Sequence, residues 1–256
     1  MLLENQVALV TGTGPNLGSE IARTLAANGA SVACLDVRID QAEKVADEIR
    51  QGGGRALAVA ADVTKPTEVQ EAMDTCTRHF GGLHILVNSA AISPRTALFD
   101  FKLEDWHRTL DIILTGVVLC TRYGAEKMIE QKKGGSIINI RSTSGYRGRT
   151  DVLAYATAKG GLMNLTRSLA LTLAPHRIRV NCVTPSSVGI PLTSGGLGRP
   201  RKESGPPKDI PLGRWSEVED PAQAVLFLAS PNSSFITGID IPVDGGTLAK
   251  GGGAGG

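Results

Sequence analysis

The sequence predicts an α/β protein built on a doubly wound parallel sheet of about seven strands, with helices on both faces. Short apolar runs alternate with longer segments of helical periodicity along most of the 256 residues. Within these runs, apolar residues follow one another without alternating polar residues, which is typical of strands buried on both faces of a parallel sheet. A glycine-rich turn at residues 11–18 also joins the first apolar run to the first helical segment.

The predicted strands and helices follow one another in regular order. We expect strands at residues 6–11, 31–36, 56–60, 84–88, 136–140, 178–184 and 239–243. We expect helices at residues 17–28, 40–51, 66–80, 103–131, 152–174 and 220–229. Gly29 ends the first helix as its C-terminal cap, and Pro66 lies in the first turn of the third helix. Pro242 assigns the last strand to an edge of the sheet, because proline has no N–H to donate.

One domain is expected over residues 1–249, followed by a flexible glycine-rich tail at 250–256. Regular periodicity stops after Thr184, and residues 186–215 are rich in Gly, Pro, Ser, Lys and Arg. An irregular segment of this length inside a compact domain is either disordered or a functional lid.

The composition excludes several classes of function. The net charge is +2 and aromatic residues make up 4% of the chain, so nothing indicates a nucleic-acid surface or an anionic membrane as partner. No apolar stretch reaches the roughly 18 residues of a membrane-spanning helix. The N-terminus enters a predicted strand at once and shows no signal-peptide pattern.

The cysteines form no metal-binding or disulfide pattern. None belongs to a Cys-x-x-Cys pair, no histidine cluster accompanies them, and each lies in an apolar run: Cys34, Cys76, Cys120 and Cys182. We therefore predict no metal site, and we expect reduced, buried thiols in a cytoplasmic protein.

The turn at residues 11–18 reads Thr-Gly-Thr-Gly-Pro-Asn-Leu-Gly, between a predicted strand and a predicted helix. Such a turn lets the backbone approach a pyrophosphate, and the helix N-terminus adds N–H donors and a positive dipole. The candidate cofactor-binding residues here are Gly12, Asn16, Leu17 and Gly18.

Asp36 ends the second predicted strand, where a carboxylate binds the adenine-ribose diol and repels a 2′-phosphate. We therefore predict NAD as the cofactor in preference to NADP. Arg38 weakens this prediction, because a nearby base can accept the phosphate. Asp62, followed by Val63, comes after the third strand; it either bonds the adenine amino group or caps the next segment.

Ser142, Tyr155 and Lys159 form the candidate catalytic group. Tyr155 and Lys159 are four residues apart on a predicted helix, so they share one face. A lysine cation beside a tyrosine favours the phenolate and lowers the phenol pKa from about 10. Such a phenol exchanges a proton with an alcohol or carbonyl oxygen, which Ser142 would hold by a hydrogen bond. The alternative is a surface tyrosine and lysine that happen to lie one helical turn apart.

Together these motifs resemble the short-chain dehydrogenase/reductase family of the Tyr-x-x-x-Lys type, along nearly the whole chain. The matching segments keep the family's order and spacing: residues 11–18, 62–63, 88–91, 142, 155–159, 181–185 and 244–246. The resemblance implies a Rossmann-like fold and an oxidoreductase that transfers a hydride between a nicotinamide cofactor and a secondary alcohol or ketone.

The resemblance also assigns roles to residues of this chain. It implies that Tyr155 is the acid/base, that Lys159 lowers its pKa and holds the nicotinamide ribose, and that Ser142 positions the substrate oxygen. It implies that residues 186–215 form the substrate loop, and that a homotetramer or homodimer forms through helices 103–131 and 152–174. Further cofactor contacts are implied for Asn88, Ala90, Pro185 and Val188.

Several positions depart from the family pattern. Asn16, Ser89, Ala91, Ser186 and Ile190 stand where other residues are usual, with Thr193 near the last of these. The sharpest departure is Ile113, seven residues after Trp106, where the family usually has an asparagine that holds a water of the proton relay.

The departure at Ile113 has two interpretations. We expect the proton relay to be impaired but not abolished, since Ser142, Tyr155 and Lys159 remain. The alternative is that the relay is dispensable or is supplied by another group. A second hypothesis for the whole chain is a non-catalytic or weakly active NAD-binding sensor or scaffold with the same fold; we favour the enzyme.

Basic residues gather near the predicted substrate site. The 186–215 segment carries Arg199, Arg201, Lys202, Lys208 and Arg214, and Ser142 is flanked by Arg141, Arg147 and Arg149. One interpretation is an anionic substrate such as a carboxylate. The other, which we favour from sequence alone, is a solvated loop, because charge without geometry specifies little.

Overall fold

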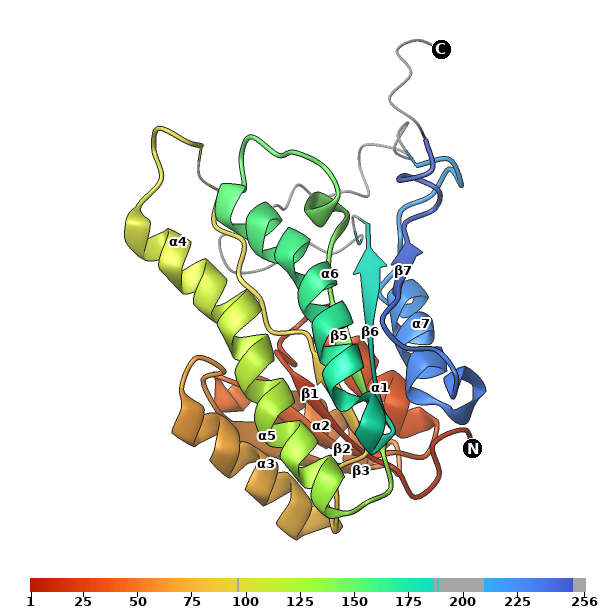
Figure 1. Ribbon diagram of the computed structural model, residues 1–256. Helices are drawn as coiled ribbons and strands as arrows, with labels where there is room; N and C mark the ends of the chain where they lie inside the picture. Colours follow the sequence, from red (N-terminus) through yellow and green to blue (C-terminus); the bar gives the residue numbers. More distant parts are fainter. Residues whose placement is uncertain (96, 187, 189–209, 251–256) are drawn as a thin grey trace.

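A computed structural model describes residues 1–95, 97–186, 188 and 210–250 (Figure 1). The described residues build a seven-stranded, wholly parallel sheet in the order β3-β2-β1-β4-β5-β6-β7. The strands are β1 Val7–Thr11, β2 Ser31–Asp36, β3 Arg55–Ala60, β4 Ile85–Asn88, β5 Gly135–Ile140, β6 Ile178–Pro185 and β7 Asp240–Val243. The predicted fold class is therefore confirmed.

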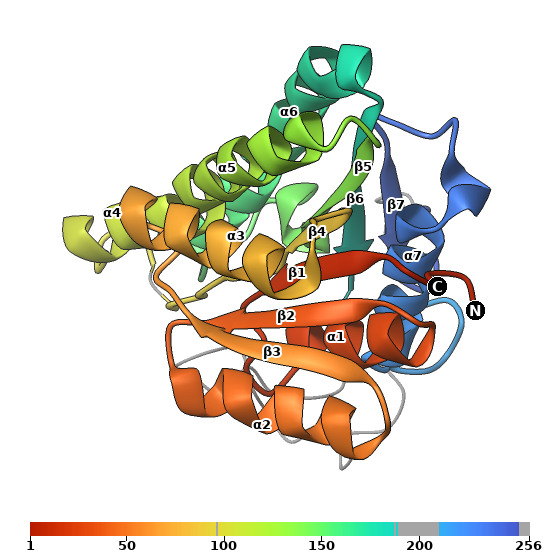
Figure 2. The same cartoon turned by 90° about the horizontal axis from the view of Figure 1, so that it is seen from below.

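Helices cover both faces of the sheet (Figure 2). Helices α1, α2 and α7 pack on one face, and α3, α5 and α6 pack on the other. The helices are α1 Leu17–Ala27, α2 Ile39–Gln51, α3 Pro66–Phe80, α4 Leu103–Leu110, α5 Gly116–Glu130, α6 Leu153–Leu173 and α7 Glu219–Ala229. The ends of each predicted helix lie within two residues of the observed ends, except for the segment 103–131, which is interrupted.

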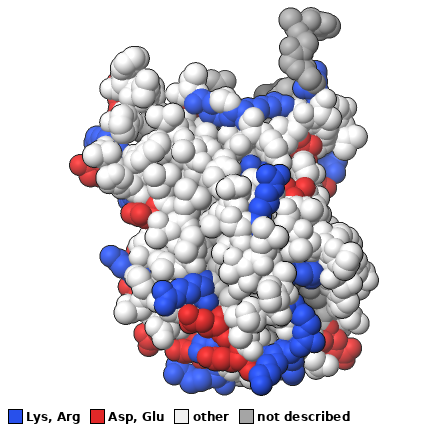
Figure 3. Space-filling model, in the orientation of Figure 1, with Lys and Arg blue, Asp and Glu red and all other residues white. Residues whose placement is uncertain are grey.

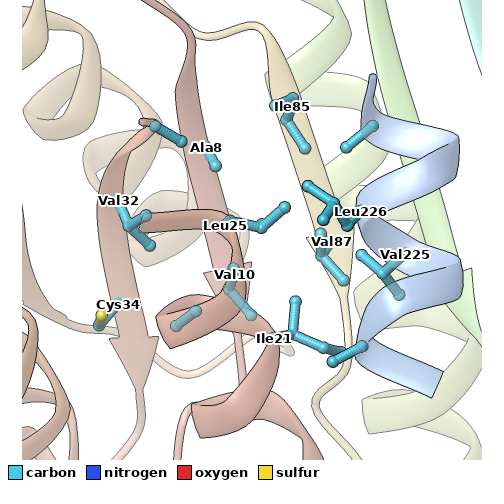
Figure 4. Close-up of a cluster of buried hydrophobic side chains, with 14 of the residues drawn as sticks. Ala8, Val10, Ile21, Leu25, Val32, Cys34, Ile85, Val87, Val225 and Leu226 are labelled. Atoms are coloured by element: carbon cyan, nitrogen blue, oxygen red, sulfur yellow. The ribbon is translucent and has the colours of Figure 1, made fainter. Parts of the chain in front are cut away.

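The core is divided by the sheet into two layers. Ala8 and Val10 of β1 point into the layer under α1, α2 and α7, while Leu9 points into the opposite layer. Figure 4 shows the first layer, where Leu25 of α1 and Leu226 of α7 meet over β1 and β4. Successive strand residues point to opposite faces, so both faces must be apolar, as the uninterrupted apolar runs predicted.

The predicted helix 103–131 is interrupted in its first half. Residues Asp111–Thr115 form one π-helical turn between α4 and α5. A π turn inserts an extra residue into the helix and is common at functional sites. Gly116 follows it, and a Cβ there would lie 2.9 Å from the Val63 side chain, so the close approach requires glycine.

The remaining expectations concern the cysteines, membrane spans and the C-terminal part. The four cysteines are unpaired and buried. Among the described residues, no helix is both long enough and apolar enough to cross a bilayer. Most of the expected loop at 186–215, including Ile190 and Thr193, lies outside the described residues, as does the expected tail apart from Lys250.

Candidate active site

A cavity of about 1000 Å³ opens where the strands end. Its lining comes from the carboxyl ends of β2, β5 and β6 and from the residues that follow β1, β3 and β4. Ligands of doubly wound proteins bind at this edge of the sheet, at the point where the strand order reverses. The predicted site residues that line it are Gly12, Asn16, Leu17, Gly18, Asp36, Asp62, Val63, Ala90, Ser142, Tyr155, Lys159, Pro185 and Val188.

Asn88 is the predicted site residue that does not line this cavity. Its side chain is buried and donates to the Asn139 Oδ1 atom at 2.9 Å and to the Thr121 Oγ1 atom at 3.3 Å. Asn139 in turn donates to Thr166 Oγ1 at 2.8 Å. Asn88 thus ties β4 to β5 and α5 beneath the cavity.

The glycine-rich turn leaves room at the N-terminus of α1. Gly12 has φ +70°, and a Cβ on it would lie 2.6 Å from the Cα of Ala90, so only glycine fits. Asn16 precedes the first residue of α1, and its Oδ1 atom is buried without a hydrogen-bond partner among the described residues. An open helix N-terminus beside an unsatisfied buried amide fits a polar, anionic ligand group.

Asp36 faces this turn from the end of β2. Its Oδ2 atom accepts a hydrogen bond from the Gly14 N–H at 2.9 Å, and its Oδ1 atom accepts one from the Arg38 N–H at 3.0 Å. These bonds fix the carboxylate at the cavity wall.

Asp62 caps the segment after β3, which is one of the two roles that the sequence left open. Its Oδ1 atom accepts hydrogen bonds from the Thr64 N–H at 2.9 Å and from the Thr64 hydroxyl at 2.8 Å, which caps the turn after β3. The residue also lines the cavity, so its capping bond orients the carboxylate there.

Ser142, Tyr155 and Lys159 meet at the opposite end of the cavity from Asp36. Ser142 follows β5, and its side chain acts on the Tyr155 phenol so as to lower the pKa of that phenol. Tyr155 lies in the first turn of α6, and the Lys159 Nζ atom is 5.7 Å from the centre of its ring. Lys159 is 3% exposed, and Nζ donates to the Ile140 carbonyl oxygen at 2.6 Å.

The protonation of this group differs from the expectation. Burial raises the pKa of the Tyr155 phenol, although the Ser142 hydrogen bond and the charge of Arg149 oppose this rise. Burial lowers the pKa of Lys159 to about 7, with the neighbouring Arg141 acting in the same direction and Cys182 opposing it. The side chain whose pKa lies near neutral pH is therefore Lys159 and not Tyr155.

Ile113 lies directly behind the catalytic group. It is fully buried in a small cluster with Ala158 and Leu162, against which Tyr155 packs. Its side chain has no hydrogen-bonding atom, so it cannot hold a water as an asparagine amide would.

The basic residues near the predicted substrate site differ in their surroundings. Arg149 lines the cavity and pairs with Asp151 at 3.1 Å. Arg141 also lines the cavity, but its guanidinium is bonded to Asp240; Arg147 does not line it and donates to the Thr247 carbonyl oxygen. Arg214 pairs with Asp220, and the remaining basic residues of the loop lie outside the described residues: Arg199, Arg201, Lys202 and Lys208.

Sequence reasoning missed Ser93, Arg95 and Arg108, which also line the cavity. Ser93 and Arg95 follow β4, so the rule that ligands bind beyond the carboxyl ends of strands was a usable signal. Arg108 belongs to α4, and helical periodicity does not reveal that this helix reaches the cavity.

Known proteins similar to this chain share its length and fold. A family model described as enoyl-(acyl carrier protein) reductase matches residues 13–247. The trans-4-hydroxycyclohexanecarboxylate dehydrogenase of Sinomonas cyclohexanicum is 40% identical, over 95% of this chain and 93% of that protein. The meso-2,3-butanediol dehydrogenase of Serratia marcescens is 34% identical, over 98% of each chain. A crystal structure of a short-chain type dehydrogenase/reductase from Mycobacterium marinum superposes with a TM-score of 0.87, at 38% identity and 96% coverage of each chain.

Proposed function

Because the chain belongs to the short-chain dehydrogenase/reductase family and is an oxidoreductase acting on hydroxyl groups, we propose that it exchanges a hydride between NAD and a secondary alcohol or ketone. The observation that carries the proposal is the shared cavity. Ser142, Tyr155 and Lys159 line one end of it, and Asp36 with the glycine-rich turn lines the other.

The cavity residues fit a dinucleotide. The turn at Gly12 and the N-terminus of α1 would hold the pyrophosphate, Asp36 the adenosine ribose, and Lys159 the nicotinamide ribose. The bound nicotinamide supplies the hydride donor or acceptor.

The proton is handled by the chain's own residues. In alcohol oxidation the Ser142 hydroxyl hydrogen-bonds to the substrate oxygen, and Tyr155 accepts the hydroxyl proton; in ketone reduction Tyr155 returns it. When Lys159 carries its proton, its charge beside the ring favours the phenolate, which opposes the rise that burial causes in the Tyr155 pKa.

The function is tested by NADH oxidation against a panel of cyclic and acyclic ketones. We expect turnover with at least one of them, and loss of turnover in Tyr155→Phe, which keeps the ring and removes the hydroxyl. NADH binding without turnover on any ketone would favour the sensor or scaffold instead.

The structure also favours an anionic group on the substrate. The arginines that line the cavity outnumber its acidic residues, which are Asp36 and Asp62; the arginines are Arg38, Arg95, Arg108, Arg141 and Arg149. Arg95 and Arg108 form no ion pair within the part of the chain that the structure describes. Figure 3 shows a short band of Lys and Arg atoms near the top of the view.

A substrate carboxylate is consistent with one relative, which is named for a hydroxycyclohexanecarboxylate. We expect kcat/KM for a carboxylated alcohol to exceed that of its neutral analogue and to fall with ionic strength, because salt screens exposed charges. Arg108→Gln should reduce that preference, whereas Arg78→Gln, on the surface of α3, should not. Equal kcat/KM values without salt dependence would exclude an anionic substrate.

A further inference from the structure

Arg141 and Asp240 form a buried ion pair behind the catalytic group. Arg141 directly follows β5 and Asp240 opens β7, and their side chains are 2% and 4% exposed. Asp240 also accepts hydrogen bonds from the Thr184 hydroxyl, at 2.8 and 2.7 Å, and from the Tyr146 hydroxyl at 2.8 Å. The Tyr146 ring lies 4.5 Å from the Arg141 guanidinium carbon. The pair therefore joins β5, β6 and β7 at the base of the cavity.

The same arginine contacts the backbone of the catalytic lysine. The Arg141 Nε–H donates to the Lys159 carbonyl oxygen at 3.1 Å. A Cβ on Gly145 would lie 2.6 Å from that oxygen, so the Gly145 backbone closes the other side. The Lys159 ammonium bonds to Ile140, the residue before Arg141. Both the peptide and the ammonium of Lys159 are thus held by the segment 140–145.

Stability alone gives no reason for such a pair. Two charges removed from water lose hydration energy that their mutual attraction only partly restores, and well-packed apolar side chains are often as stable. The hydrogen bond to Lys159 gives the pair a further role, because a displacement of about 1 Å in a catalytic group can cost about 10²-fold in rate.

We propose that the Arg141–Asp240 pair is a positioning unit for Lys159, which fixes the lysine against the end of β5 and sets the electrostatic field at its ammonium. The proposal rests on the proposed function for its effect on catalysis. Arg141 and Asp240 do not touch the reacting atoms; they act through Lys159.

The charges around Lys159 determine in which direction each substitution should shift its pKa. Arg141 lies beside it at the end of β5, Cys182 faces it from β6, Tyr155 lies on its own helix, and Arg149 acts on that phenol from the loop before α6. Removal of the Arg141 charge removes a neighbouring cation, so the pKa of Lys159 should rise. Neutralising Asp240 leaves Arg141 uncompensated, so the pKa of Lys159 should fall. If the pair only stabilised the fold, the two substitutions would not shift the pKa of Lys159 in opposite directions.

The test compares Arg141→Met, Asp240→Asn and the matched control Arg147→Met, an exposed arginine bonded to the Thr247 backbone. The Lys159 titration is followed by NMR of lysine side chains labelled with ¹³C at Cε, and its signal is assigned by its loss in Lys159→Met. We expect an upward shift in Arg141→Met, a downward shift in Asp240→Asn and none in Arg147→Met. We also expect kcat to fall by up to about 10²-fold in Arg141→Met, with the pH dependence of kcat displaced in the same direction.

A shift of the same sign in Arg141→Met and Asp240→Asn, or no shift in either, would overturn the proposal. If Arg141→Met does not fold, Arg141→Lys answers the question, because it keeps the charge and loses the Nε–H bond to Lys159. The expectation there is a reduced kcat with a Lys159 titration close to that of the wild type, and an unchanged kcat would contradict it. The titrations need no substrate, so failure of the proposed reaction in the wild type is distinguished from failure of the positioning role.

Discussion

Lys159 is 3% exposed and donates from its Nζ atom to the Ile140 carbonyl oxygen. This burial brings its pKa to about 7, so its charge changes within the neutral range. The i, i+4 spacing of Tyr155 and Lys159 predicted their common face correctly. The spacing could not reveal how far the two side chains are removed from water, because their burial depends on β5, β6 and the loop after β5. This loss of hydration decides the direction of both pKa shifts.

The pKa of Lys159 predicts a pH-dependent stability. Below about pH 7 the lysine is protonated in both the folded and the unfolded chain, and the folded state bears the cost of burying the charge. Between pH 7 and the unfolded pKa near 10.5, only the unfolded chain keeps the proton, so stability rises with pH. Relative to Lys159→Met, the wild type should gain at most about 1.4 kcal/mol per pH unit over this range. Urea unfolding at pH 7 and pH 9.5 measures this difference, and an equal difference at both values would contradict it.

We expect the Asp36 carboxylate to determine the preference for NAD over NADP. Replacing it by alanine removes the carboxylate that repels a 2′-phosphate and leaves Arg38 at the cavity wall. The ratio of kcat/KM for NAD over NADP should fall at least about tenfold, which corresponds to about 1.4 kcal/mol of binding energy. The matched variant Asp40→Ala, on the surface of α2, should leave the ratio unchanged. The same ratio in both variants would show that Asp36 does not select the cofactor.

The π turn between α4 and α5 is the element in which sequence and structure differ most. Periodicity predicted one helix over 103–131, because a single inserted residue barely disturbs an amphipathic pattern. The turn carries Ile113 into the buried cluster behind Tyr155. The position that packs against Tyr155 is therefore apolar.

Ile113→Asn tests whether this apolar position limits proton transfer. We expect kcat on a competent alcohol to rise by up to about 10²-fold, because general acid–base steps contribute about 10²–10⁴-fold. The buried amide should also lower stability by about 1–3 kcal/mol if it finds no partner. Ile113→Val, which adds no hydrogen-bonding group, is the control. A kcat that does not rise at any pH would count against an impaired relay.

At the scale of the molecule, the strand order places β1 beside β4, and the helices that follow them lie on opposite faces. This arrangement opens the cavity at the carboxyl edge of the sheet. The order was predictable in outline from the alternation of strands and helices. The contacts of Arg141 with Asp240, or of Asn88 with Asn139, were not, because they join residues far apart in the chain.

We expect copies of the chain to associate through the outer faces of α5 and α6. Val118 on α5 and Leu171 on α6 are 42% and 79% exposed, so both helices present apolar side chains to solvent. We expect a native mass of two or four times 26.8 kDa by light scattering, and Val118→Glu should lower it because a buried, unpaired charge is costly. Gln51→Glu on α2 serves as the control. A monomeric wild type would contradict pairing through these helices.

Isotope labelling of the cofactor shows whether the protein passes a hydride from the nicotinamide to its substrate. A ketone that the protein reduces is incubated with NADH in which both hydrogens at C4 of the nicotinamide are deuterium, and the alcohol is analysed by mass spectrometry. We predict one deuterium on the carbinol carbon of the product, and no product in Tyr155→Phe. Consumption of NADH without deuterium in the alcohol, or full product formation by Tyr155→Phe, would contradict it.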